Sequence, residues 1–156
     1  MRFTFFILMA LFLVSCNKSK FKSAPQISFL SLTPDRLNRN EILSSGPVLS
    51  FHVTDAEGDF GYIDNNTKSV IKVLSQKDTL TDTFTFDFPQ FSGSNMRNFN
   101  ADVSVNIANV IVNSLLPHTF PSPSRVDTVR FKFYVQDFAG NHSNVVETGN
   151  LYYTIP

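Results

Sequence analysis

Apolar and polar residues alternate with a period of two along four stretches of the chain. In residues 48–55 (VLSFHVTD), Leu49, Phe51 and Val53 share one face and polar residues occupy the other. The same pattern recurs in residues 83–88, 101–107 and 129–137. Such alternation is typical of antiparallel strands that bury one face and expose the other.

Three further stretches rich in β-branched and aromatic residues predict additional strands, at residues 26–32, 69–75 and 150–155. Loops with proline and glycine separate the strands, as in SSGPV and PHTFPSPS. Many short strands with turn residues between them favour a β-sandwich over an α/β fold. We therefore predict an all-β fold, a single Ig-like antiparallel β-sandwich of about seven to eight strands over residues 26–156.

One segment, residues 107–116 (IANVIVNSLL), departs from the period of two. Its apolar residues recur at helical spacing, at Ala108, Ile111, Val112 and Leu115. Its content of β-branched residues and asparagine nevertheless favours a strand or an irregular crossover. A single helical turn there is compatible with the sandwich.

The predicted domain is long enough to form its own core. About 130 residues follow residue 25, and 13 of the 17 phenylalanines lie beyond residue 15. Burial of a side chain of this size contributes roughly 1.5–3 kcal/mol. We therefore expect a core that needs no disulfide.

The first fifteen residues have the pattern of an export signal. Arg2 precedes an uncharged apolar run at residues 3–15. As a helix this run rises about 20 Å, too short for a hydrocarbon core of roughly 30 Å. It ends at LVSC, residues 13–16, which resembles the lipobox of bacterial lipoproteins. The resemblance implies cleavage after residue 15 and acyl chains on Cys16, which would anchor the chain stably to a membrane. The alternatives are an uncleaved signal anchor and a secreted protein with a free thiol.

The charge changes along the chain beyond Cys16. Lys18, Lys20 and Lys22 form a basic tether over residues 16–25, and the remainder holds 9 basic against 13 acidic residues, a formal charge of −4. A basic tether is expected to be attracted to the anionic headgroups of membrane lipids. A mildly acidic domain argues against nucleic acid as a partner, because nucleic acid requires a basic face.

Two loops of the predicted sandwich have similar sequences. In FHVTDAEGDFGY (51–62) and FYVQDFAGNHSN (133–144), a strand runs into an aspartate and then into a loop with glycine. Together with the lipobox, these stretches make the chain similar to Ig-like and fibronectin-like modules of bacterial surface lipoproteins, particularly those of Bacteroidota. The resemblance covers nearly the whole mature chain. In an Ig-like strand order, both loops emerge at one end of the sandwich.

The two loops carry a candidate metal site. If they meet, Asp55, Glu57, Asp59 and Asp137 converge, and calcium prefers six to eight oxygen ligands of this kind. The spacing is not that of an EF-hand. The same acidic residues and the neighbouring glycines equally suit tight turns with solvated carboxylates. Calcium is thus one of two interpretations of this pattern.

No catalytic constellation is evident in the sequence. The only cysteine is assigned to the lipid, and His52, His118 and His142 are scattered, without CxxC or HExxH. Each histidine is expected to be an ordinary surface residue. The acidic loops leave a carboxylate-dependent hydrolase as a minor alternative.

Aromatic residues outside the predicted core are candidate contacts for a partner. Tyr134 is expected to face outward, and four phenylalanines fall in predicted loops: Phe91, Phe99, Phe120 and Phe138. Exposed rings stack on sugars or anchor proteins. Loop phenylalanines also fold back over sandwich ends as plugs, which is the alternative interpretation.

Two threonines lie in three-residue stretches, DTL and DTV, that resemble the O-glycosylation pattern of exported Bacteroidota proteins. They are Thr79 and Thr128. They are named as candidates, since matches of three residues arise readily in a threonine-rich chain.

These observations predict a lipid-anchored module of a bacterial envelope that binds an envelope protein or a glycan. The alternative is a structural accessory subunit of an outer-membrane complex. Surface-exposed Bacteroidota lipoproteins often carry acidic residues after the cysteine, whereas residues 17–23 here are basic. This favours an outer-membrane anchor facing the periplasm over one facing the cell surface.

Overall fold

The computed structural model describes residues 21–61, 64, 67–77, 80–90, 97–114 and 125–155. The predicted signal peptide and the first half of the tether, residues 16–20 with Cys16, lie outside these residues, as does Thr79. The elements are β1 (Gln26–Thr33), β2 (Arg36–Asn38), α2 (Arg39–Ser44), β3 (Val48–Asp55), β4 (Val70–Lys77), β5 (Leu80–Asp87), β6 (Phe99–Asn106), α3 (Ala108–Ser114), β7 (Arg125–Val129), β8 (Phe131–Gln136), β9 (Val146–Glu147) and β10 (Leu151–Ile155). The all-β fold is confirmed, with ten strands in place of seven to eight.

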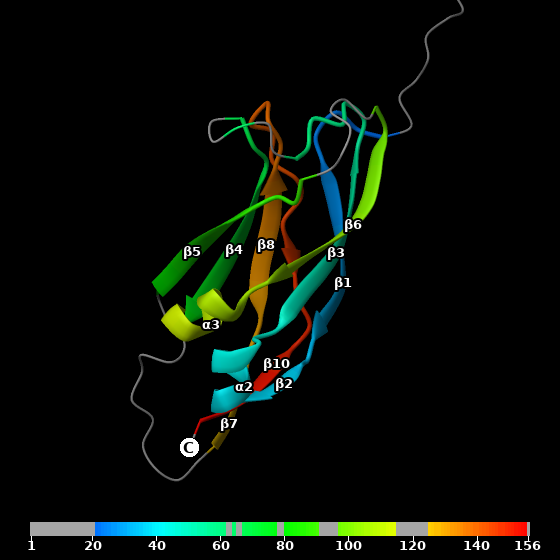
Figure 1. The fold of residues 1–156 in the computed structure, drawn as a ribbon. Coiled ribbons are helices and arrows are strands. Elements are labelled where there is room, and N and C mark those ends of the chain that lie inside the picture. The colour runs from blue at the N-terminus through cyan, green and yellow to red at the C-terminus, as the bar shows by residue number, and fades with distance from the viewer. Residues whose placement is uncertain are drawn as a thin grey trace, which may run out of the picture.

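Two antiparallel sheets form the sandwich (Figure 1). One has the order β1-β3-β6 and the other the order β5-β4-β8-β9. The alternation predicted for residues 48–55 is confirmed, since Leu49, Phe51 and Val53 are fully buried. Phe51 meets Phe133 of β8 across the two sheets, with 5.3 Å between ring centroids.

Breaks in two long strands explain the higher strand count. Only Arg130 separates β7 from β8, and residues 148–150 separate β9 from β10. Beyond these breaks, β7 and β10 join a third sheet of order β2-β10-β7, in which β2 is parallel to β10. At the break, Phe131 N donates to Thr148 Oγ1 (3.0 Å), and Thr148 N donates to the carbonyl of Phe131 (2.9 Å). The single strand predicted over residues 129–137 was therefore wrong at Arg130, because a threonine side chain replaces one step of the ladder.

The strand or crossover predicted for residues 107–116 was also wrong, because α3 forms there. Its start is capped by Asn106, whose Oδ1 accepts from Ala108 N (2.8 Å). Val110, Ile111 and Ser114 lie on its buried face. Burial of this face outweighs the modest helix propensity of β-branched residues.

The helix α2 was not predicted from the sequence, although its capping residues are readable there. Asn38 Oδ1 accepts from Glu41 N (3.1 Å), and Glu41 Oε2 accepts from Asn38 N (2.7 Å). This reciprocal pair is a capping box, which satisfies two amide groups at the start of the helix. Ile42, fully buried, attaches the helix to the core.

Gly46 lies where the end of α2 meets the start of α3. Its φ is +63°, and a Cβ built there would overlap Ala108 Cβ and lie 2.8 Å from Ala108 Cα. We expect Gly46→Ala to lower the free energy of unfolding by roughly 2–4 kcal/mol, because left-handed backbone and overpacking each add a cost. Denaturant unfolding measures this loss.

Gly149→Ala is the matched control. Gly149 has no positive φ, and its nearest neighbours are Phe29 ring carbons at 3.7 Å, an ordinary contact distance. Its stability should change by about 0.5 kcal/mol or less. Equal losses in the two variants would contradict the packing argument.

The sandwich has two different ends. The loops that follow β3 and β8 lie at one end, and α2 and α3 lie toward the other (Figure 1). Among the described residues, no helix is long and apolar enough to cross a membrane.

Candidate functional site

The loop after β3 is held against the sandwich end by Phe60. This ring is buried and lies 4.9 Å from the ring of Phe88 and 5.3 Å from that of Phe99, measured between centroids. Phe99 was predicted to lie in a loop, which was wrong, since it begins β6 and is only 5% exposed. Phe60 thus fixes the position of its neighbour Asp59.

The two loops with similar sequences meet. Phe138 N donates to the backbone carbonyl of Asp59 (3.1 Å), a hydrogen bond that joins the loop after β3 to the turn after β8. Ser69 Oγ donates to the same carbonyl (3.4 Å). Hydrogen bonds from two other segments, at Ser69 and at Phe138, therefore hold Asp59 beside Asp137.

Three carboxyl groups converge where the loops meet. Asp55, Asp59 and Asp137 each offer an oxygen, and these oxygens lie within 4.8 Å of one another. Asp55 is fully buried and Asp137 is 3% exposed. Glu57, the fourth residue predicted for this site, is exposed and lies outside the cluster. We call Asp55, Asp59 and Asp137 the carboxylate cluster.

Some carboxylate oxygens of the cluster accept hydrogen bonds from their own turns. Asp55 Oδ2 accepts from Glu57 N (3.1 Å) and Gly58 N (2.6 Å), in a turn that Gly58 completes with a φ of +70°. Asp137 accepts from the backbone N (2.8 Å) and Nδ2 (2.9 Å) of Asn141. The turn chemistry expected of these aspartates is therefore present.

Turn chemistry leaves two carboxylate oxygens unexplained. Asp55 Oδ1 and Asp59 Oδ1 are buried and have no hydrogen-bond partner within the described part of the chain. Buried polar atoms are almost always satisfied, and an exception in a native structure calls for a missing proton, water or ion. Both atoms belong to the carboxylate cluster.

Burial and crowding change the acidity of the cluster. The pKa of Asp55 is raised from 3.8 to about 6: burial is the main cause, a side-chain hydrogen bond with Asp59 and the charges of Asp59 and Asp137 add to it, and the hydrogen bond from Gly58 opposes it. Burial, followed by the charge of Asp137, also raises the pKa of Asp59. The cluster therefore has a raised affinity for a positive charge, supplied either by a proton or by a cation.

The other predicted surface residues are dispersed. Tyr134 is partly exposed and its ring lies 5.1 Å from that of His142, and Phe138 is partly exposed in the turn after β8. Thr128 is exposed on β7. His52 Nδ1 lies 2.7 Å from Asp102 Oδ1 on the outer face of β3 and β6. His118 lies outside the described residues.

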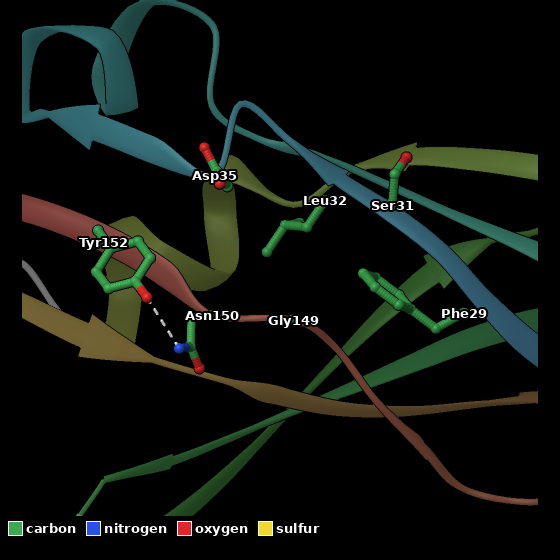
Figure 2. A pocket seen from close by; sticks show the side chains of 7 residues that line it. All are labelled: Phe29, Ser31, Leu32, Asp35, Gly149, Asn150 and Tyr152. Atoms are coloured by element: carbon green, nitrogen blue, oxygen red, sulfur yellow. Dashed lines mark hydrogen bonds between the residues drawn. The ribbon is translucent and has the colours of Figure 1, made fainter.

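A surface groove that the sequence did not predict lies between β1 and the segment that leads into β10 (Figure 2). Its volume is about 370 Å³, and seven residues line it. Phe29 and Gly149, which lie close together there, are 120 positions apart in the sequence. The only local signal was the glycine-asparagine pair at residues 149–150, which also predicts an ordinary turn.

Comparison with known proteins gives no family. No protein-family model matches the chain, and no curated protein matches it. Among solved structures, a Pseudomonas fluorescens alkylpurine DNA glycosylase AlkC bound to DNA containing an abasic site analog is similar at 14% identity and a TM-score of 0.36. The match covers 88% of this chain and 32% of the glycosylase chain, so the chain spans about a third of that protein's length.

Proposed function

We propose that the chain is a lipid-anchored binding module of a bacterial envelope, in which a calcium ion fixes the loops at one end of the sandwich. The observation that carries the cation is the pair of buried, unpartnered oxygens, Asp55 Oδ1 and Asp59 Oδ1. The anchor rests on the lipobox that ends at Cys16. The partner would be an envelope protein or a glycan on the outer membrane, met on the periplasmic side.

Calcium suits the chemistry of the carboxylate cluster. Its ligand distances of about 2.3–2.6 Å allow opposite ligands to stand roughly 4.6–5.2 Å apart. The cluster oxygens, within 4.8 Å of one another, therefore need no backbone movement to share one ion. Three carboxylates leave further positions for water, which is usual for calcium. The divalent charge would also offset the repulsion among three crowded acids, two of which are buried.

Such an ion would act by joining the two loops. Without it, one backbone hydrogen bond joins the two loops within the described part of the chain, from Phe138 N to the Asp59 carbonyl. Coordination by Asp59 of one loop and Asp137 of the other would hold both in a single geometry. A partner then binds a preorganised surface, which lowers the entropic cost of association. Tyr134 and Phe138 lie on the strand and turn that lead into this region.

We expect calcium to raise the melting temperature of the full chain, extracted in detergent. The native state gains about 1.4 kcal/mol at ten times the dissociation constant and about 2.7 kcal/mol at 100 times, equivalent to a rise of several degrees for this length. A calorimetric titration from about 0.1 to 10 mM calcium covers the affinities typical of extracytoplasmic modules.

Two variants make the calcium test specific. Asp137→Asn removes a cluster carboxylate and should abolish the rise, whereas Glu57→Gln removes an exposed carboxylate two residues from Asp55 and should leave it unchanged. An equal rise in both variants would assign the effect to general charge screening. No rise in the unmodified chain would leave the cluster as turn chemistry with a shared proton.

A structural accessory subunit is the second candidate. Its support is β7, which lies at an edge of its sheet and carries Val126, 55% exposed. An exposed edge strand is a template for strand addition by another chain. Recovery from native membranes in a complex of fixed stoichiometry would favour this role.

A further inference from the structure

The groove between β1 and β10 lies away from the carboxylate cluster. At one end of β1, Gln26 pairs with Thr54, next to Asp55, whereas at the other end Thr33 pairs with Val48. The groove is lined by Phe29, Ser31 and Leu32, from the middle of β1 toward its second end, and by the residues around Gly149. Its volume of about 370 Å³ is within the range of small-molecule sites, roughly 300–1,000 Å³. The groove is therefore independent of any cation at the opposite end.

A β-bulge shapes the first wall of the groove. Phe29 pairs with Phe51 and Ser31 pairs with Ser50, so Leu30 is an extra residue in β1 and is 49% exposed. Bulges bend a strand and redirect the side chains beside them. Here the flanking residues Phe29 and Ser31 both line the groove (Figure 2).

Gly149 keeps the Phe29 ring accessible from the groove. A Cβ at this position would contact two carbons of that ring, Cε1 and Cζ, at 3.7 Å. Phe29 is accordingly only partly buried. The absence of a side chain at residue 149 leaves the aromatic surface of Phe29 open beside Leu32, the aliphatic residue of a groove whose other side chains carry polar groups.

The opposite wall is a connected set of polar groups. Asn150 Nδ2 donates to the hydroxyl of Tyr152 (3.1 Å, Figure 2), and Asn150 Oδ1 accepts from Arg130 Nε (2.5 Å). The guanidinium of Arg36 lies 5.0 Å from the centre of the Tyr152 ring. These contacts hold Asn150 and Tyr152 in place before any ligand arrives. The Tyr152 hydroxyl, which accepts from Asn150, keeps its own proton to donate.

Asp35 supplies an acceptor at the rim. Its backbone carbonyl accepts from Tyr152 N (2.8 Å), which fixes its position beside the wall. Within the described residues, no hydrogen bond or ion pair reaches its exposed carboxylate. A carboxylate accepts two hydroxyl groups at once, through its two oxygens.

We propose that this groove binds an uncharged sugar ring of a glycan. A pyranose has an apolar C–H face, which suits the Phe29 ring, and vicinal hydroxyls, which suit the Asp35 carboxylate and the Tyr152 hydroxyl. Acidic sugars are disfavoured, because Asp35 would repel their carboxylates.

Titration of the full chain with chitotriose, cellotriose and maltotriose tests the proposal, by calorimetry and by saturation-transfer NMR. At least one neutral trisaccharide should bind, and a trisaccharide of uronic acids should bind at least about tenfold more weakly. Gly149→Leu, which covers the Phe29 ring, should abolish binding. Asp35→Asn should weaken it about tenfold, through loss of a charged acceptor. Asp82→Asn, an exposed aspartate on β5, is the matched control and should bind as the unmodified chain does.

Several outcomes would overturn the proposal. They are no binding of any neutral trisaccharide, equal binding of the acidic one, and binding that survives both Gly149→Leu and Phe29→Leu in variants with an unchanged melting temperature. Binding of trilysine in place of sugars, lost in Asp35→Asn, would identify a site for basic peptides. Repeating the titration in metal-free buffer separates this proposal from the calcium site, because sugar binding should persist there.

Discussion

In metal-free buffer, the charge on Asp55 is expected to remove roughly 3 kcal/mol of stability between about pH 4 and pH 7.5. Its pKa is raised from 3.8 to about 6 in the folded chain. The folded state therefore binds this proton more tightly than the unfolded state does. The stabilisation is complete below the unfolded value of 3.8 and is lost as the pH rises through 6.

The effect of Asp55 is isolated by comparing the unmodified chain with Asp55→Asn. An asparagine still accepts from Gly58 N and can donate its amide to Asp59, so the turn survives without the buried charge. The variant should be the more stable of the two at pH 7.5, and its pH profile should be flatter. Denaturant unfolding at half-unit pH steps gives both profiles.

With calcium present at neutral pH, the unmodified chain should become more stable than Asp55→Asn, the reverse of the order expected in metal-free buffer. An ion in the carboxylate cluster replaces the proton that Asp55 loses, so the unmodified chain regains stability and Asp55→Asn does not. Parallel pH profiles for the two proteins in metal-free buffer would show that Asp55 is an ordinary carboxylate. That result would also remove the electrostatic argument for the cation.

Phe133→Ala is expected to lower the free energy of unfolding by about 3–5 kcal/mol. Phe133 is fully buried at the centre of its sheet, where it pairs with Val73 on one side and Val146 on the other. Its ring also meets Phe51 of the opposite sheet. Removing the ring therefore opens a cavity between both layers, and the melting temperature should fall on the order of 10–20 °C.

Phe138→Ala is the control for this substitution. Phe138 lies in the turn after β8 and is partly exposed to solvent, so its truncation should cost about 1 kcal/mol or less. Calorimetry or circular dichroism measures both melting temperatures. Similar losses for the two phenylalanines would show that the core is not centred between β3 and β8.

The period-two pattern by itself determined most of the sandwich. Strands with one buried face need alternating residues, and Leu49, Phe51 and Val53 follow that rule in the sequence and in the structure. Each strand was also expected to run into an aspartate: β3 ends at Asp55, whereas β8 ends at Gln136, one residue before Asp137. The alternation follows from local geometry, because successive side chains of a strand point to opposite faces.

Tertiary structure decided the secondary structure of segments whose local propensity was weak or favoured both helix and strand. Residues 108–114 are rich in β-branched residues yet form α3, because Val110 and Ile111 are buried together there. The long strand around Arg130 breaks because Thr148, from a distant part of the chain, supplies a side-chain oxygen to the ladder. The residues around α3 and around Arg130 in the sequence do not show that α3 will be buried or that Thr148 will reach the break.

For the carboxylate cluster and the groove, too, part was evident from the sequence and part was decided by tertiary structure. The sequence placed four acids near one another, but burial of Phe60 selects Asp59 for the carboxylate cluster and leaves Glu57 in solvent. The groove exists only because β1 and β10 bring Phe29 to Gly149, 120 positions later. Side-chain alternation is a local property and can be read from the sequence, whereas contact between distant residues depends on the packing of the whole chain.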